Sequence, residues 1–152
     1  MNIAIVGATG LVGRKIIDVL SERQVFADNY YLYASEHGCG TVLRVSDKNV
    51  VVERLQPETV AKRHTDIAFF SAGKSVAINF APLFVKNGAV VIDNSSAFRM
   101  DPEVPLIVPE VNPEAIAQHK GIIANPNCST IIMVMALKPL YDIAKIKRVV
   151  VS

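Results

Sequence analysis

Apolar residues along the chain form short continuous runs that alternate with amphipathic stretches. Residues 3–6 are such a run, closed by Gly7, and a short apolar run bounded by a turn residue predicts a buried strand. The stretch that follows, 11–23, predicts a helix because its apolar positions fall on one helical face: Leu11, Ile16, Val19 and Leu20. The chain is therefore expected to begin as strand, turn and helix.

The same pattern recurs to the end of the sequence. Apolar runs predict further strands at 29–35, 66–73, 89–95, 121–125 and 147–151. Helical spacing predicts helices at 74–87 and 129–138. Residues 41–45 and 49–55 predict a small hairpin or two short strands. Four prolines interrupt residues 95–113, which predicts a long structured loop with an extended piece at 106–108.

The alternation of strands and helices determines the expected fold class. Most of the predicted strands are continuous apolar runs rich in Val, Ile or Phe, so both faces of the sheet are expected to be covered. The sequence therefore predicts an α/β fold, a Rossmann-like, doubly wound, mostly parallel sheet with helices on both faces. The last apolar run stops at Ser152 without a polar tail, so we expect the chain to be part of a longer protein.

Composition narrows the classes of function. The chain has 152 residues, of which 51% are hydrophobic and 20% charged, as expected of a globular protein with a substantial core. A net charge of +2, with scattered basic residues, argues against a nucleic-acid partner. No signal peptide or membrane-spanning run is evident. Cys39 and Cys128 match no metal-binding spacing, so we expect a cytoplasmic protein with reduced thiols and no metal.

A glycine-rich turn joins the first predicted strand to the first helix. Gly7, Gly10 and Gly13 have the spacing G-x-x-G-x-x-G, a shifted form of the G-x-G-x-x-G fingerprint of dinucleotide-binding folds. Such glycines permit a tight turn, close approach to a pyrophosphate and close helix packing, while N–H groups at the helix start face the anion. An ordinary connection is the alternative, but strand, turn and helix together favour nucleotide binding.

The end of the second predicted strand is expected to select the cofactor. An acid at this point holds the ribose 2′-hydroxyl of NAD, whereas a hydroxyl or a cation accepts the 2′-phosphate of NADP. Ser35 favours the phosphate, Glu36 opposes it, and a neutral His37 would help only in part. A solvated turn is an equally good interpretation of Glu36 and His37.

Cys128 stands between a polar turn and an apolar stretch. The flanking Asn127 and Ser129 suit a helix cap. A cysteine at a helix N-terminus lies at the positive end of the helix dipole, which favours the nucleophilic thiolate. Free cysteines are nevertheless commonly buried and inert, so the local pattern alone favours an inert thiol.

Arg99 lies in the proline-rich loop, shortly after the carboxyl end of a predicted strand. Open α/β sheets bind ligands at this edge, and the planar guanidinium suits a phosphate. A surface ion pair with Asp101 or Glu103 is the alternative. Together with the glycine turn, a phosphate site makes a reactive Cys128 the better interpretation.

Four stretches give the chain a specific resemblance: GATGLVG, FFSAG, GAVVIDNSSAFRMDPEVPLIVPEVN and IIANPNCSTI. The chain resembles the N-terminal part of the bacterial aspartate-β-semialdehyde dehydrogenases over nearly its whole length. The resemblance implies an NADP-dependent oxidoreductase, with NAD as the alternative cofactor, in the biosynthesis of lysine through diaminopimelate, threonine and methionine. In this family a thiolate attacks aspartyl phosphate, phosphate leaves, and NADPH reduces the thioester to aspartate semialdehyde.

The resemblance also implies roles for individual residues. Cys128 would be the nucleophile, Asn127 would help to hold the reacting oxygen, and Arg99 would bind the substrate phosphate. The residues expected around the cofactor are Gly7, Thr9, Gly10, Leu11, Val12 and Gly13 at the pyrophosphate, Ser35 at the 2′-phosphate, and Ser71, Ala72, Gly73, Asn94 and Pro126 towards the nicotinamide.

The chain departs from the family pattern at His37, where arginine is common, and at Lys74 and Ile132, which replace glycine and glutamine. His37 leaves the strictness of NADP over NAD open. Residues 1–127 are expected to form the cofactor domain and residues 128–152 the start of a catalytic and dimerisation domain. The rest of that domain would supply a glutamine, a substrate-binding arginine and a catalytic histidine. We therefore expect the chain alone to be inactive and the full-length protein to be a homo-oligomer.

Two other functions stay open at this point. N-acetyl-γ-glutamyl-phosphate reductase shares the thiol, the cofactor turn and acyl-phosphate chemistry, although DNSSAFRM and NPNCST resemble the aspartate enzyme. In a non-catalytic nucleotide-binding module, Cys128 would be a core residue that alkylating reagents reach slowly.

Overall fold

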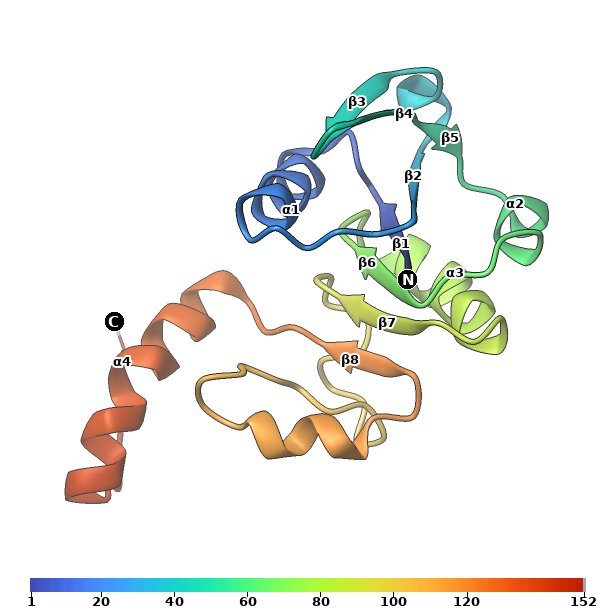
Figure 1. Cartoon of the computed structure of the whole chain (residues 1–152). Helices are drawn as coiled ribbons and strands as arrows, with labels where there is room; N and C mark the ends of the chain where they lie inside the picture. The colour runs from blue at the N-terminus through green and yellow to red at the C-terminus, as the bar shows by residue number, and fades with distance from the viewer. Residues whose placement is uncertain (152) are drawn as a thin grey trace.

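Six parallel strands form the central sheet of the computed structural model, which describes residues 1–151. In order across the sheet they are β5 (Glu53–Arg54), β2 (Asn29–Ala34), β1 (Asn2–Val6), β6 (Ile67–Phe70), β7 (Val90–Asp93) and β8 (Ile122–Ala124) (Figure 1). The chain runs outward from β1 to β2 and then returns to build the other half of the sheet from β6. The predicted Rossmann-like fold is confirmed, with its switch point between β1 and β6.

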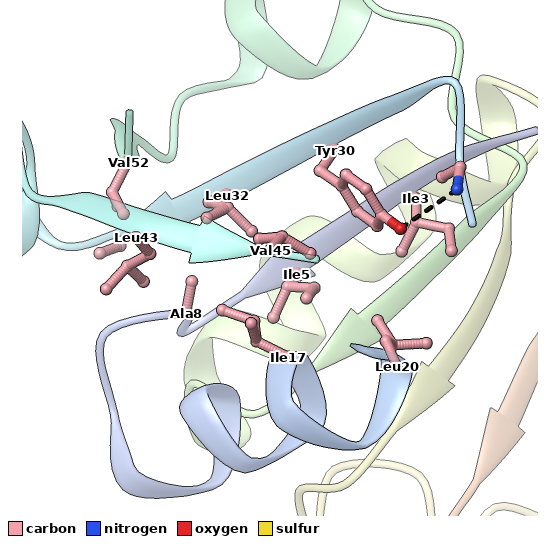
Figure 2. Close-up of a cluster of buried hydrophobic side chains, with 12 residues drawn as sticks. Ile3, Ile5, Ala8, Ile17, Leu20, Tyr30, Leu32, Leu43, Val45 and Val52 are labelled. Carbon is pink, nitrogen blue, oxygen red and sulfur yellow. Dashed lines mark hydrogen bonds between the residues drawn. The ribbon is translucent and has the colours of Figure 1, made fainter. Parts of the chain in front are cut away.

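Two apolar layers cover the sheet. On one face, α1 (Leu11–Glu22) and the hairpin of β3 (Val42–Val45) and β4 (Lys48–Val51) pack on β1 and β2 (Figure 2). On the other face, α2 (Pro57–Ala61) and α3 (Lys74–Lys86) cover β1, β2, β6 and β7. There the ring of Phe84 packs edge-on against Phe70 and Tyr33, with ring centroids 5.3 and 6.1 Å away. Helices therefore lie on both faces, as predicted.

The buried face of α1 agrees only in part with the predicted one, in which Leu20 is buried and Ile16 packs against the core as expected. Gly13, Ile17 and Leu20 are buried, whereas Leu11 is 88% exposed and Val19 is 39% exposed. The buried stripe follows the helical spacing i, i+4, i+7, but its first member is a glycine. A pattern taken from apolar side chains alone is therefore rotated away from the true contact face.

The middle of the chain contains short elements that the hydrophobic pattern did not predict. These are α2, which begins with Pro57 after a Gln56–Thr59 capping box, and the short 3-10 helices η1 (Glu36–Gly38) and η2 (Pro113–Gln118). The predicted hairpin is confirmed, although its second strand ends at Val51. The extended piece at 106–108 is also confirmed, since Leu106 bridges Ala124 of β8.

The C-terminal prediction was wrong in two respects. The last helix, α4 (Cys128–Ala144), is longer than predicted because it continues through Pro139, and residues 147–151 form no strand. A strand needs a neighbour to pair with, and α4 leads this segment away from the sheet (Figure 1). Helix α4 itself has no buried residue.

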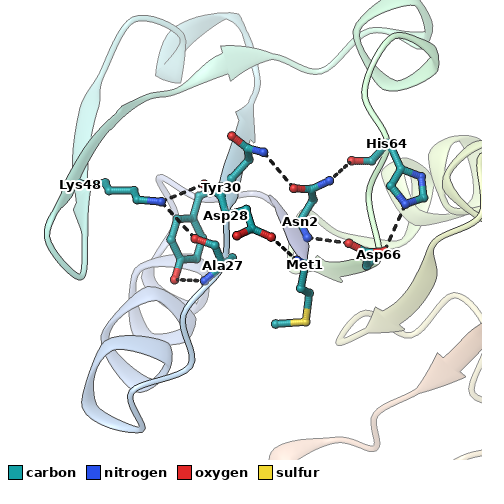
Figure 3. Close-up of polar contacts among 9 residues, drawn as sticks. Met1, Asn2, Ala27, Asp28, Tyr30, Lys48, His64 and Asp66 are labelled. Atoms are coloured by element: carbon teal, nitrogen blue, oxygen red, sulfur yellow. Dashed lines mark hydrogen bonds and ion pairs between the residues drawn. The ribbon is translucent and has the colours of Figure 1, made fainter.

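Polar contacts fasten the amino ends of the central strands (Figure 3). The backbone N–H of Asn2 donates to Asp66 Oδ2 at 2.6 Å, which lowers the pKa of Asp66. The N-terminal amine pairs with Asp28, and Lys48 Nζ donates to the carbonyl of Asp28 at 2.8 Å. Polar groups at this edge of the sheet are therefore paired with one another.

Tyr33 places a hydroxyl in the apolar layer beside α3. Its side chain is fully buried, and within residues 1–151 the hydroxyl has no hydrogen-bond partner. Burial raises the pKa of Tyr33 to about 12, against the opposing effect of the positive charge on Arg63. The hydroxyl is therefore desolvated without a geometrically defined hydrogen bond, and the charge of Arg63 offsets only part of that cost.

We expect Tyr33→Phe to raise the free energy of unfolding by about 1 kcal/mol, because it removes a buried, unpaired hydroxyl. Tyr30→Phe is the matched control, since the Tyr30 hydroxyl donates to the Val25 carbonyl at 2.9 Å and accepts from the Ala27 N–H at 3.1 Å. The control should lose about 1 kcal/mol. Urea unfolding followed by circular dichroism measures both, and an equal loss in the two variants would contradict the unpaired state of Tyr33.

Candidate functional site

The glycine turn between β1 and α1 is packed too closely for side chains at two of its three glycines. Gly7 has φ +89°, and a Cβ on it would lie 2.9 Å from the backbone of Ser71. A Cβ on Gly13 would lie 2.1 Å from the Gly7 carbonyl oxygen. Gly10, the N-cap of α1, has φ −73° and room for a Cβ, which would meet only the Gly7 carbonyl oxygen at 3.4 Å. Gly7 and Gly13 are thus required by the fold, whereas Gly10 is not.

A cavity of about 650 Å³ opens beside this turn, at the carboxyl ends of β1, β2 and β6. Six of the predicted cofactor residues line it: Gly7, Thr9, Gly10, Ser35, Ser71 and Ala72. The volume and the glycine floor fit the adenosine and pyrophosphate of a dinucleotide. The structure therefore brings these residues together in one place.

Other predicted cofactor residues lie outside the cavity lining. The side chain of Leu11 is exposed to solvent, and that of Val12 faces a separate apolar hollow with Ile16 and Phe69. Gly13 is buried under the turn, Gly73 caps α3, and Asn94 and Pro126 follow β7 and β8. Leu11 and Val12 can serve a pyrophosphate only through their backbone N–H groups.

Six residues of the lining were not predicted to contact the cofactor: Val6, Ala34, Arg54, Leu55, Val76 and Phe80. Val76 and Phe80 lie on the apolar face of the predicted helix 74–87, so their helical spacing was a usable signal. No local sequence signal marked Arg54, because its place at the site depends on the parallel pairing of β5 with β2, which puts it opposite Ala34.

Cys128 is the first residue of α4 and is exposed. Asn127 caps the helix as predicted, since its Oδ1 accepts the Ser129 N–H at 3.0 Å, and it lies 3.9 Å from the Cys128 sulfur. Ile131 donates its N–H to the Asn127 carbonyl. Among the described residues, the N–H groups of Cys128 and Thr130 have no acceptor and remain available in the first turn. The thiol is accessible in this chain, as are the other residues of α4, none of which is buried.

Arg99 joins the ends of two neighbouring strands. Its Nε donates to the Asn125 carbonyl at 2.9 Å and its Nη2 to the Asn94 carbonyl at 3.1 Å. Within residues 1–151 it makes no ion pair with Asp101 or Glu103, so that alternative is wrong. The half-buried guanidinium donates to backbone oxygens, which leave its charge unneutralised, and its Nη1 makes no hydrogen bond within residues 1–151.

Hydrogen bonds at the ends of β7 and β8 anchor the loop that carries Arg99. Asp93 is fully buried and accepts both the N–H of Ser95 at 3.0 Å and its hydroxyl at 2.7 Å. The Asn125 side chain donates to Asn94 Oδ1 at 2.5 Å. Asn125 is three residues before Cys128, so Arg99 is bonded to the backbone of the segment that leads into α4.

Residues 1–151 contain neither a metal-binding cluster nor a membrane-spanning helix. No group of three or more His, Cys, Asp or Glu side chains is arranged to hold a metal ion. None of the described helices has the length and apolarity needed to span a membrane.

Known proteins similar to this chain share its fold and sequence. Aspartate-semialdehyde dehydrogenase from Aquifex aeolicus (strain VF5) is 60% identical over 99% of this chain and 45% of its own length. The chain thus spans about half the length of the curated relatives it matches. The Vibrio cholerae aspartate semialdehyde dehydrogenase II complexed with ASA is 49% identical, with a TM-score of 0.88 over 93% of this chain and 46% of that one.

A more distant solved structure carries a bound cofactor. Aspartate semialdehyde dehydrogenase with NADP from Candida albicans is 30% identical, with a TM-score of 0.77 over 93% of this chain and 47% of that one. The family model of the semialdehyde dehydrogenase NAD-binding domain matches residues 2–119. The chain therefore belongs to the semialdehyde dehydrogenase family, of which it contains the NAD-binding domain.

Proposed function

We propose that the full-length protein is a phosphorylating, NADP-dependent aspartate-semialdehyde dehydrogenase. This chain supplies its cofactor domain, residues 1–127, and the start of its catalytic domain from residue 128. The observation that carries the proposal is the link between an exposed thiol at a helix N-terminus and an arginine held by the Asn125 carbonyl. The 60% identity to the Aquifex aeolicus protein favours the aspartate enzyme over N-acetyl-γ-glutamyl-phosphate reductase.

The chain's own groups have distinct parts in this chemistry. The Cys128 thiolate attacks the acyl carbon of aspartyl phosphate, and the C–O bond to phosphate breaks to give a thioester. Arg99 holds the phosphate through the charge and the Nη1 donors that its backbone contacts leave unused. The N–H groups of Cys128 and Thr130 stabilise the tetrahedral oxyanion, because the Ser129 N–H is already taken by Asn127. Asn127 retains its amide N–H groups for the same oxygen.

The cavity beside the glycine turn is the proposed NADP site. Bound NADPH supplies the hydride that reduces the thioester. The N–H groups at the start of α1 face the pyrophosphate, and Ser35 lies at the cavity wall where the ribose phosphate is expected. The acid–base group would come from the remainder of the protein, so the chain alone is expected to bind cofactor without turnover.

The thiol can be tested in the full-length protein. Cys128→Ser should lower kcat for NADPH-dependent reduction of aspartyl phosphate by at least about 10³-fold, because the hydroxyl is a far weaker nucleophile. Cys39→Ser is the matched control, since Cys39 is also an exposed free cysteine, and it should leave kcat unchanged. Activity that survives in Cys128→Ser would refute the proposal. A wild-type protein that reduces only N-acetylglutamyl phosphate would establish the other substrate.

The glycines of the turn are predicted to separate folding from binding. Gly13→Ala should lose about 2 kcal/mol or more of stability, because its Cβ collides with the Gly7 carbonyl. Gly10→Ala should keep its melting temperature but bind NADPH more weakly, since the added methyl group occupies the wall that the pyrophosphate approaches. Thermal unfolding and NADPH titration measure the two effects. Equal melting temperatures for both variants would contradict this division.

A further inference from the structure

A pair of opposite charges stands at the rim of the proposed NADP cavity. Arg54, the last residue of β5, lies opposite Ala34, and Glu36 follows Ala34 by two residues in η1. Arg54 Nη1 and Glu36 Oε1 are 3.7 Å apart, and both residues line the cavity. Arg54 is the one arginine or lysine in the lining among residues 1–151, where Glu36 and His37 are the other titratable side chains.

The ion pair between Arg54 and Glu36 is weak enough for Arg54 to exchange Glu36 for another partner. The 3.7 Å between Arg54 Nη1 and Glu36 Oε1 exceeds the length of a hydrogen bond, and the side chains of Arg54 and Glu36 are 53% and 75% exposed. Exposed ion pairs of this kind contribute little to stability. A guanidinium binds a phosphate through two parallel charge-assisted hydrogen bonds, which is a better partner than a carboxylate at 3.7 Å.

We propose that Arg54 receives the 2′-phosphate of NADP and thereby offsets Glu36, which by itself would select NAD. This inference rests on the proposed function of the cavity and names the residue that sets its cofactor choice. With NADP, Arg54 exchanges Glu36 for the phosphate, and Ser35 adds a hydroxyl donor. With NAD, Arg54 stays with Glu36 and the carboxylate accepts the ribose 2′-hydroxyl. The site therefore admits both cofactors, and Arg54 favours NADP.

Titration of the 152-residue chain with NADPH and NADH, followed by nucleotide fluorescence, tests Arg54 directly. Arg54→Gln should weaken NADPH binding about tenfold or more, as expected for the loss of a charge-assisted phosphate contact, and leave NADH binding unchanged. Glu36→Gln should shift the preference in the opposite direction. Arg44→Gln removes the same charge from β3, outside the cavity lining, and should change neither affinity.

The outcomes separate this inference from the proposed function. If the wild-type chain binds neither NADPH nor NADH, the proposed cofactor site is wrong, and the role of Arg54 fails with it. Wild-type chain that binds NADPH, with equal binding by Arg54→Gln, overturns the role of Arg54 alone. An equal loss of NADPH and NADH affinity in Arg54→Gln would assign Arg54 a structural role and also overturn the inference. Partial recovery of NADPH affinity in Arg54→Lys would support a charge contact.

Discussion

The close contact between α1 and the turn that precedes it is the constraint on which the rest of the cofactor edge depends. No side chain fits between Gly13 and the Gly7 carbonyl, so the helix starts directly against the end of β1. Gly38 repeats this arrangement at the end of β2, where a Cβ would lie 2.8 Å from both Thr9 Oγ1 and the Ala34 side chain. Gly13 lies close to the backbone of the turn and Gly38 lies close to side chains of the turn and β2, so the turn, β2 and η1 are packed together beside the cavity.

The opposite half of the sheet is organised by a polar network instead of by close backbone packing. Arg99 spans the carbonyls of Asn94 and Asn125, while buried Asp93 holds the beginning of the loop through Ser95. The arginine is therefore fixed by neutral acceptors, which orient the guanidinium without consuming its charge. An arginine paired with Glu103 would have had no such capacity, and Glu103 pairs with Lys120 instead.

Local signals in the sequence predicted most of the sheet and the position of the turn, because continuous apolar runs and glycines act over a few residues. The face of α1 was predicted only in part, because Gly13 occupies a buried position that no apolar side chain marks. Arg54 was missed because parallel pairing with β2 joins residues far apart in the chain. The prediction of a strand at 147–151 was wrong for a related reason, since a segment with strand propensity forms a strand only where a partner strand is available.

The two halves of the proposed site differ in how firmly they are held. The cofactor half rests on buried strands and on the layer around Ile3, Ile5 and Leu32. Helix α4 carries the thiol but buries none of its residues, so Asn125 and buried Pro126 provide its connection to the sheet. The proposed acyl transfer would require the thiol, the phosphate site and the oxyanion donors to keep their positions within about half an ångström. Within residues 1–151, Arg99 is held by two strand ends, whereas no residue of α4 is buried, so Arg99 is fixed more firmly than Cys128.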